Sequence, residues 1–221
     1  MAPAAPPARG RGRPSRPVLS TERITDAAIR IVSTRGYRHL TMTGLARELE
    51  VSTSALYNHT PSKRDVLIRV QDRINDGIDC SGFGTLPWDR ALELWARSYR
   101  DCYAEHTAMI PVMAVLPVAD SPHTLRMYET VARGLAEAGF AGGTVVDVVV
   151  AVESFVFGSA YDATAPAEIF EPGDRAELAP VFTRSARARP ADPRAAADRA
   201  FDVGLGAMLE GFRARLAAGR D

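Results

Sequence analysis

The chain has 221 residues, of which 46% are hydrophobic and 24% charged, proportions that are ordinary for a globular protein. The net charge is zero, but residues 1–70 hold 12 basic and 5 acidic side chains and residues 71–221 hold 15 and 22, so we expect the front of the chain to meet a polyanion. No uninterrupted apolar run of about 20 residues occurs, which argues against a membrane-spanning protein, and no apolar segment follows the first arginines, which argues against a secretory signal. Cys80 and Cys102 belong to no paired motif, which argues against a disulfide-stapled protein and favours the cytoplasm.

Residues 1–19 are mainly Pro, Ala, Gly and Arg, so we expect a disordered basic arm. The stretch Arg9–Pro14 resembles the AT-hook core, in which an extended basic segment lies in the minor groove of A·T-rich DNA. Arg11 and Arg13 are the candidate contacts, because a narrow groove attracts inserted arginines. A solubilising tail is the alternative, and the motif alone does not decide between the two.

Residues 20–67 predict a three-helix domain. Ser20 or Thr21 is the expected cap of a first helix that Gly36 ends, and Thr41, Ser52 and Ser62 are the expected caps of three later helices. Leu45, Ala46 and Leu49 form the inner face of one short helix, and Ala55 and Leu56 that of the next. Small side chains at Ala46 and Ala55 allow these two short helices to cross closely, which indicates a helix-turn-helix unit.

The pattern of positions from residue 20 to 70 resembles the N-terminal domain of TetR-family transcription regulators. It is carried by Leu40-Thr41, Leu45-Ala46, Leu49, Val51-Ser52, Ala55-Leu56-Tyr57, His59 and Ser62-Lys63. Two positions depart from the family pattern. Glu50 stands where a turn glycine is usual and predicts a strained backbone, and Thr60 replaces an apolar residue and predicts a weaker packing contact.

The chemistry of these residues, together with the resemblance, predicts the DNA contacts. Polar and outward positions on the expected recognition helix are Thr53, Ser54 and Asn58. The resemblance implies that Tyr57 and His59 hold the DNA backbone, with packing inside the protein as the alternative, and that Thr41 and Thr43 face the backbone from the preceding helix. Lys63 places an ammonium group where a phosphate would bind.

The remaining chain predicts helices separated by Pro and Gly, so the fold class is all-α, with a helical ligand-binding and dimerisation domain over residues 68–221. The expected segments are a helix ending near Gly77, a helix over 88–106, a piece over 107–116 kinked or split by Pro111, a helix capped by Ser121 that runs to Gly139, an apolar helix over 145–161, a mostly irregular stretch over 163–193 and a last helix over about 195–217. Residues Gly139-Phe140 and Ser154–Gly158 resemble the tetracycline-repressor subgroup, which implies a homodimer built on the last two long helices and a palindromic operator.

Polar or adaptable side chains on otherwise apolar helix faces are the candidates for an effector site. They are Tyr99, Cys102, Tyr103, His106, Met109, Met113, Met127 and Glu153. Ordinary core packing is the alternative for each of them, least so for Glu153, because a carboxylate in a Val/Phe helix needs a partner or a purpose. The four histidines are scattered, so the sequence suggests no metal, no cofactor and no catalytic centre.

These observations favour a DNA-binding transcription regulator, most simply a repressor that a small molecule releases from its operator. A ligand-independent or activating regulator is the first alternative, which differs in whether any compound changes operator affinity. A helical enzyme that uses the apolar pocket is the second, which would show turnover and no sequence-specific DNA binding.

Overall fold

The computed structural model describes residues 19–219 and shows ten α-helices in that range. They are α1 (Thr21–Arg35), α2 (Met42–Glu48), α3 (Thr53–Tyr57), α4 (Lys63–Asn75), α5 (Trp88–Ala104), α6 (Ile110–Met113), α7 (Pro122–Glu137), α8 (Gly142–Asp162), α9 (Pro180–Arg187) and α10 (Pro193–Ala217). No strand occurs between residues 19 and 219, so the predicted all-α fold class is confirmed. The basic arm, with Arg11 and Arg13, lies almost entirely outside the described residues.

The first three helices begin where the sequence predicts, because each is capped by its own hydroxyl side chain. Ser20 accepts a hydrogen bond from the N–H of Arg23, Thr41 from that of Gly44 and Ser52 from that of Ala55. Helix α1 buries Ile24, Ala27, Ala28, Ile31 and Val32 on one face. Gly36 follows the helix with φ of 86°, a backbone conformation that glycine adopts without the steric strain that a Cβ would cause.

The turn between α2 and α3 contains the strain that the sequence predicts. Glu50 has φ of 56° and is the one non-glycine residue with positive φ among the described residues. The left-handed conformation costs an L-residue about 1–2 kcal/mol. Thr60 is fully buried, and its hydroxyl donates to the carbonyl oxygen of Ser62. The weaker packing expected there is therefore accompanied by a satisfied polar contact.

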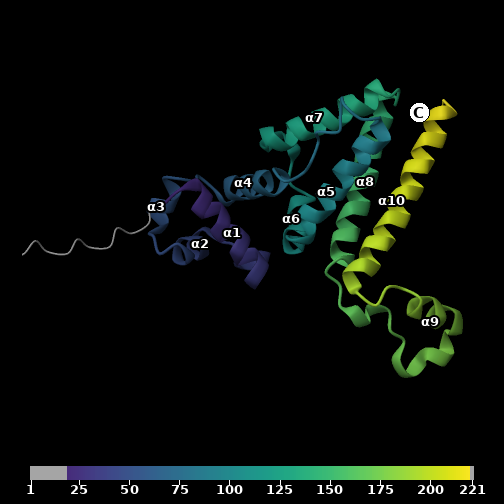
Figure 1. Ribbon diagram of the computed structural model, residues 1–221. Coiled ribbons are helices and arrows are strands. Elements are labelled where there is room, and N and C mark those ends of the chain that lie inside the picture. Colours follow the sequence, from purple (N-terminus) through teal and green to yellow (C-terminus); the bar gives the residue numbers. More distant parts are fainter. Residues whose placement is uncertain (1–18, 220–221) are drawn as a thin grey trace, which may run out of the picture.

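Helix α4 connects α1, α2 and α3 to the rest of the chain, as Figure 1 shows. It packs on α1 at one side and on α5 and α7 at the other. The predicted domain boundary at residues 67 and 68 therefore falls inside a continuous helix, so a movement of α4 is felt by both parts of the protein.

Local packing sets the role of three further residues. The piece over 107–116 is split, as expected, into the 3-10 helix Thr107–Met109 and α6, and Pro111 lies in the first turn of α6, where its missing N–H costs nothing. Tyr37, between α1 and α2, is 38% exposed at the surface. Gly204 of α10 faces Phe155 of α8, since a Cβ there would come within 2.5 Å of the Phe155 ring.

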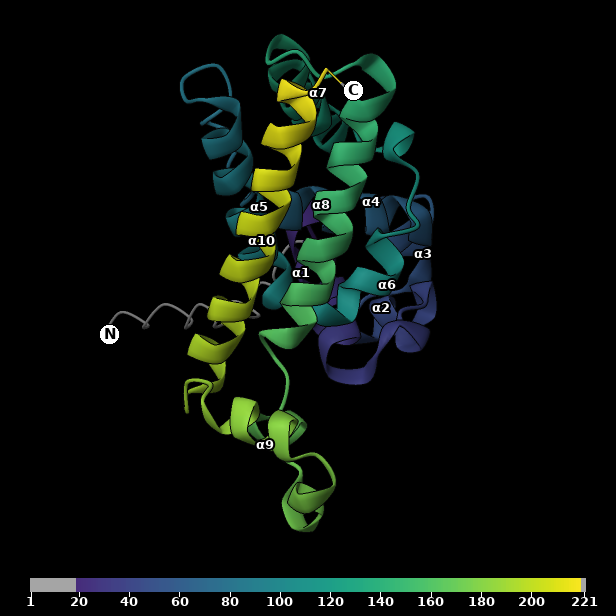
Figure 2. The ribbon, with the colours of Figure 1, turned by 90° about the vertical axis from the view of Figure 1, so that its right-hand side faces the viewer.

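Helices α8 and α10 run side by side (Figure 2). Apolar side chains on these two helices are left uncovered by the described residues. Val146, Val150 and Tyr161 of α8 and Val203 of α10 are 45–69% exposed. By length and composition α8 is long and apolar enough to cross a membrane, and 33% of its apolar window is buried within the chain. A helix with one face in the core and one apolar face exposed is equally typical of a subunit interface.

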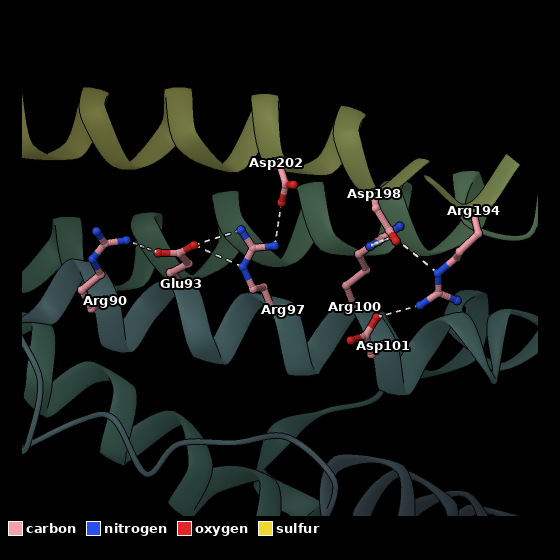
Figure 3. A network of polar contacts seen from close by, with 8 residues as sticks. All are labelled: Arg90, Glu93, Arg97, Arg100, Asp101, Arg194, Asp198 and Asp202. Carbon is pink, nitrogen blue, oxygen red and sulfur yellow. Dashed lines mark hydrogen bonds and ion pairs between the residues drawn. The ribbon is translucent and has the colours of Figure 1, made fainter. Parts of the chain in front are cut away.

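A series of ion pairs fastens α10 to α5 (Figure 3). The Arg97 guanidinium lies 2.6 Å from Asp202, and that of Arg100 lies 2.6 Å from Asp198. Arg100 is only 4% exposed and stacks over the ring of Phe201, while its Nε and Nη2 atoms have no hydrogen-bond partner among the described residues. A buried charge of this kind fixes the register of two helices more than it stabilises them.

The stretch between α8 and α10 extends away from the other helices as an excursion that carries α9 (Figures 1 and 2). It contains two short 3-10 helices, Ala167–Phe170 and Gly173–Leu178, as well as the eight residues of α9. The expectation of irregular structure with short helical pieces is confirmed.

Candidate nucleic-acid interface and candidate effector site

The predicted recognition unit forms from α2, a four-residue turn and α3. The N–H of Val51 donates to the carbonyl oxygen of Ala46 at 3.0 Å, which closes the turn, and Leu56 is fully buried under α3. A Cβ on Gly44 would come within 2.9 Å of the carbonyl oxygen of His39, so the close approach of α2 to the preceding segment requires glycine. The short helix α3 is held from below and presents its other face outward.

The residues predicted to contact DNA mostly lie on this outward surface. Thr41, Thr43, Ser54, Tyr57, Asn58 and His59 are exposed, and Thr53 is partly exposed. Tyr57 is 49% exposed, so the alternative in which its ring is packed inside the protein does not describe it. His59 is likewise exposed, although its carbonyl oxygen accepts from the Arg69 guanidinium. These exposures leave the side chains free for an external partner.

Lys63 has a different local setting from the one that the sequence suggested. Its ammonium group lies 3.9 Å from the ring centroid of Tyr37, a cation–π contact. The Ser62 hydroxyl, which caps α4, donates to the carboxylate of Asp65 in the first turn. The start of α4 thus already holds a negative group, and we expect a phosphate to meet the ammonium group of Lys63 rather than the helix terminus.

Two arginines that the sequence reasoning missed accompany this surface. Arg47 follows Thr43 by four residues on α2 and therefore shares its face. Arg38 lies in the short 3-10 helix Tyr37–His39 just before α2. Both are exposed, and neither has an ion-pair partner among residues 19–219. Their spacing was visible in the sequence, because Arg47 lies four residues after Thr43 and Arg38 three residues before Thr41.

In the C-terminal part, the structure brings together three of the predicted effector residues, namely the carboxylate Glu153 and the two tyrosines Tyr99 and Tyr103. Oε1 of Glu153 accepts the hydroxyl of Tyr99 at 2.6 Å and also the hydroxyl of Tyr128. Tyr103 joins them through its ring, whose centroid is 5.1 Å from that of Tyr99. Burial raises the pKa of Glu153, although the two phenol hydrogen bonds oppose that shift. Tyr128 and the neighbouring Phe157 were not among the sequence candidates.

A buried chain of hydrogen bonds leads from this cluster to α4. The Tyr103 hydroxyl donates to Oδ1 of Asn75 at 2.9 Å, and Nδ2 of Asn75 donates to the Thr124 hydroxyl at 3.0 Å. All three side chains are at most 2% exposed. Helices α5, α4 and α7 are therefore tied together at the last turn of α4.

Other contacts hold α4 against the start of α7. The Ser121 hydroxyl donates to Asp72, and Arg64 pairs with Asp120, which immediately precedes Ser121. Arg64 is exposed, so that ion pair contributes little by itself. Together with Asn75, these contacts fix α4 from its first turn to its last.

The remaining effector candidates lie apart from Glu153 or inside the core. Cys102 faces the end of α4, because a Cβ on Gly77 would come within 2.8 Å of its sulfur. Met109, Met113 and Met127 are buried in the hydrophobic core, which agrees with the packing alternative. His106 is partly buried at the end of α5, where burial lowers its pKa.

Two hollows of the described surface lie away from the cluster around Glu153. One of about 440 Å³ is lined by the excursion and the start of α10, including Phe170 and Arg189. Another of about 290 Å³ lies over the ion pairs between α5 and α10. Neither hollow includes the cluster around Glu153, where Tyr99 and Tyr103 are 2% and 1% exposed, so a ligand between these two rings would have to separate them. No group of three metal-ligating side chains was found between residues 19 and 219.

Comparison with known proteins gives matches over both parts of the chain. Residues 24–70 match the family described as bacterial regulatory proteins of the tetR family, and residues 84–216 match the tetracyclin repressor-like C-terminal domain. The HTH-type transcriptional repressor DrrR1 of Streptomyces coeruleorubidus is 28% identical over 67% of this chain and 56% of its own length. The class A tetracycline repressor from transposon 1721 of Escherichia coli is 27% identical over 89% of this chain and 92% of its own.

Solved structures show the same arrangement of helices. Apo ActR from Streptomyces coelicolor has a TM-score of 0.71 and 20% identity, with 91% of this chain and 98% of that one covered. BioQ with its double-stranded DNA operator has a TM-score of 0.56 and 25% identity, with 78% and 100% covered. The ActR likeness supports the fold alone.

Proposed function

The chain belongs to the TetR family of bacterial regulatory proteins, and from this premise we propose that it is a transcriptional repressor that binds a palindromic operator as a homodimer. A small molecule bound in the C-terminal part would release it from the DNA. The family consists of regulators rather than enzymes, and we assign the chain no catalytic role. A regulator of this kind acts in the cytoplasm.

The observation that carries the proposal is the exposed polar face of the helix-turn-helix unit. Hydroxyl and amide groups of Ser54 and Asn58 are free to reach base edges, although hydroxyls discriminate bases poorly. Tyr57, Lys63 and Arg47 surround them with groups that suit phosphates. DNA shape and phosphate contacts would therefore supply a large share of the binding free energy.

The exposed apolar face of α8 and α10 supports the proposed dimer. Its valines have no cover within residues 19–219, and Gly143, Gly158 and Gly206 on these helices have open space where a side chain would be. Apolar and small residues on two neighbouring helices suit a four-helix interface between two copies. Two-fold symmetry would then set the spacing of the two recognition helices on a palindrome.

Release by a ligand needs a connection between the C-terminal part and the recognition helices. Helix α4 supplies it, because Asn75 and Asp72 are bonded to α5 and α7 while Lys63 lies at the DNA end. A ligand that separates Tyr99 and Tyr103 would displace the hydrogen bond to Asn75 and shift α4. It would change operator affinity only to the extent that it binds more tightly to the shifted state, typically about 5–150-fold.

The test uses DNA that the full chain selects from a random-sequence pool. Tyr57→Ala should weaken binding to this DNA while the oligomer stays intact, and Lys63→Ala should reduce the slope of log K against log salt by about one unit. Leu125→Ala, which removes an equally exposed side chain from α7, is the matched control. Unchanged affinity and salt slope in both DNA-face variants would contradict the proposed docking.

The basic arm and the alternative regulators are tested with the same DNA. Removal of residues 1–18 should lower the salt slope by up to about 3.6 units if four arginines neutralise phosphates. An unchanged slope would favour a solubilising tail. A regulator without an effector would bind the DNA with the same affinity in the presence of every compound that binds the protein.

A further inference from the structure

Glu153 is a partly buried carboxylate that has no positive group beside it among the described residues. Its Oε1 atom accepts both phenol hydrogen bonds, from Tyr99 of α5 and Tyr128 of α7, while its Oε2 atom has no hydrogen-bond partner among residues 19–219. No arginine, lysine or histidine of the described chain forms an ion pair with it. The groups that face it from α5 and α7 are uncharged phenols.

Such an arrangement is costly for the protein alone. Desolvation disfavours the ionised carboxylate, and hydrogen bonds from two neutral hydroxyls replace only part of its hydration. By comparison, the buried Arg100 is paired with Asp198, and the half-buried Glu93 is paired with Arg97. Glu153 therefore lacks the counter-charge that these two side chains have.

The walls around the carboxylate are aromatic. The Tyr99 ring centroid lies 5.2 Å from that of Trp95 and 5.6 Å from that of Phe157, and the Tyr103 and Phe157 centroids are 5.0 Å apart. Ring faces attract a cation within about 6 Å, most strongly where water is excluded. Trp95 is fully buried, and its indole N–H has no hydrogen-bond partner among the described residues.

We propose that the effector site takes a lipophilic organic cation whose ammonium group binds Glu153 and whose apolar body displaces or stacks on Tyr99, Tyr103 and Phe157. The inference rests on the proposed function, in that it names the class of molecule that the C-terminal part recognises. The cation would supply the missing counter-charge, and the ring separation that it causes would reach Asn75 through the Tyr103 hydroxyl. Organic anions are disfavoured, because the site has a negative group and no positive one.

The experiment compares three probes with the same aromatic body and different charge. They are (2-naphthylmethyl)trimethylammonium, 2-naphthylmethanol and 2-naphthylacetate. Binding to the DNA-free full-length protein is measured by calorimetry near neutral pH. We expect the cation to bind at least about tenfold more tightly than the alcohol, because only the cation pairs with the Glu153 carboxylate, at a site that is partly closed to water. The acetate should bind more weakly still.

Variants then assign the preference to one carboxylate. Glu153→Gln keeps the shape and an acceptor for the two phenols, so it should fold and should bind the cation and the alcohol with similar affinity. Glu129→Gln removes an exposed carboxylate from α7 and should keep the full preference. A preference that persists in Glu153→Gln, a tighter complex with the alcohol or acetate, or no saturable binding of the cation up to its solubility limit would each overturn the inference.

Operator release is measured separately so that the two proposals can fail independently. If the cation binds through Glu153 but no ligand alters operator affinity, the ligand-released repressor is contradicted and the cation site stands. If a neutral compound releases the DNA equally from wild type and Glu153→Gln, the repressor stands and the cation site is wrong.

Discussion

The hydrogen-bond chain from Tyr103 through Asn75 to Thr124 gives the sharpest test of how α4 is held. Asn75→Leu keeps most of the side-chain volume but removes both partners, which leaves two buried hydroxyls unsatisfied. Each such group costs about 1–3 kcal/mol, so the variant should lose about 3 kcal/mol of unfolding free energy. For a chain of this length that loss corresponds to a fall in Tm of about 6–12 °C.

The measurement is thermal and urea unfolding at one fixed protein concentration, because dissociation of a dimer makes Tm depend on concentration. Asn58→Leu is the matched control, since Asn58 is exposed on the DNA face and should change stability by less than about 0.5 kcal/mol while weakening operator binding. Adding Tyr103→Phe to Asn75→Leu removes one stranded hydroxyl and should restore part of the lost stability. Equal Tm values for the two Asn variants, or no recovery in the double variant, would refute the reasoning.

Four other outcomes follow from the structure. Val150→Arg places a charge on the exposed apolar face of α8 and should convert the dimer to monomers, which sedimentation would record. These monomers should bind operator DNA poorly in a titration, and a dimer that persists would place the interface elsewhere. Glu50→Gly relieves the positive φ and should stabilise the protein by up to about 1 kcal/mol in urea unfolding, whereas a loss would mean that the turn is unstrained. Because the pKa of Glu153 is raised in the folded protein, its contribution to stability is fully present below the carboxyl pKa of the unfolded chain and is lost as pH rises through the folded pKa. The Tm of Glu153→Gln minus that of wild type should therefore grow with pH, and a constant difference would contradict this. Asp198→Ala leaves the buried Arg100 guanidinium without its counter-charge, whereas Arg100→Met removes the charge itself. In urea unfolding Asp198→Ala should therefore lose more unfolding free energy than Arg100→Met, and the reverse order would contradict the cost of an unpaired buried guanidinium.

The local part of the fold was predictable because its signals act over three or four residues. A cap such as Ser52 bonds the N–H three residues ahead, so the sequence contains both partners. The strain at Glu50 was predictable for the same reason, since a single turn position sets its φ. These short-range rules located the helix-turn-helix unit and most of its outward residues without any tertiary information.

The recognition face was predicted less completely. Arg47 was overlooked although it lies four residues after Thr43, because its charge is ordinary for an exposed helix position. The environment of Lys63 was also not readable from the sequence, because its contact with Tyr37 spans the whole recognition unit. Contacts between elements set the final orientation of these cations.

The sequence by itself identified Glu153 as an unusual carboxylate and placed Tyr99 on an apolar helix face, because both follow from composition and helical spacing. Only the tertiary structure decided which partners they meet. Tyr99 and Tyr128 lie 54 and 25 positions from Glu153 in the chain, and Cys102, only three positions after Tyr99, faces the end of α4 instead. Helical periodicity gives the direction of a side chain relative to its own helix, whereas the packing of α4, α5, α7 and α8 determines what stands opposite it.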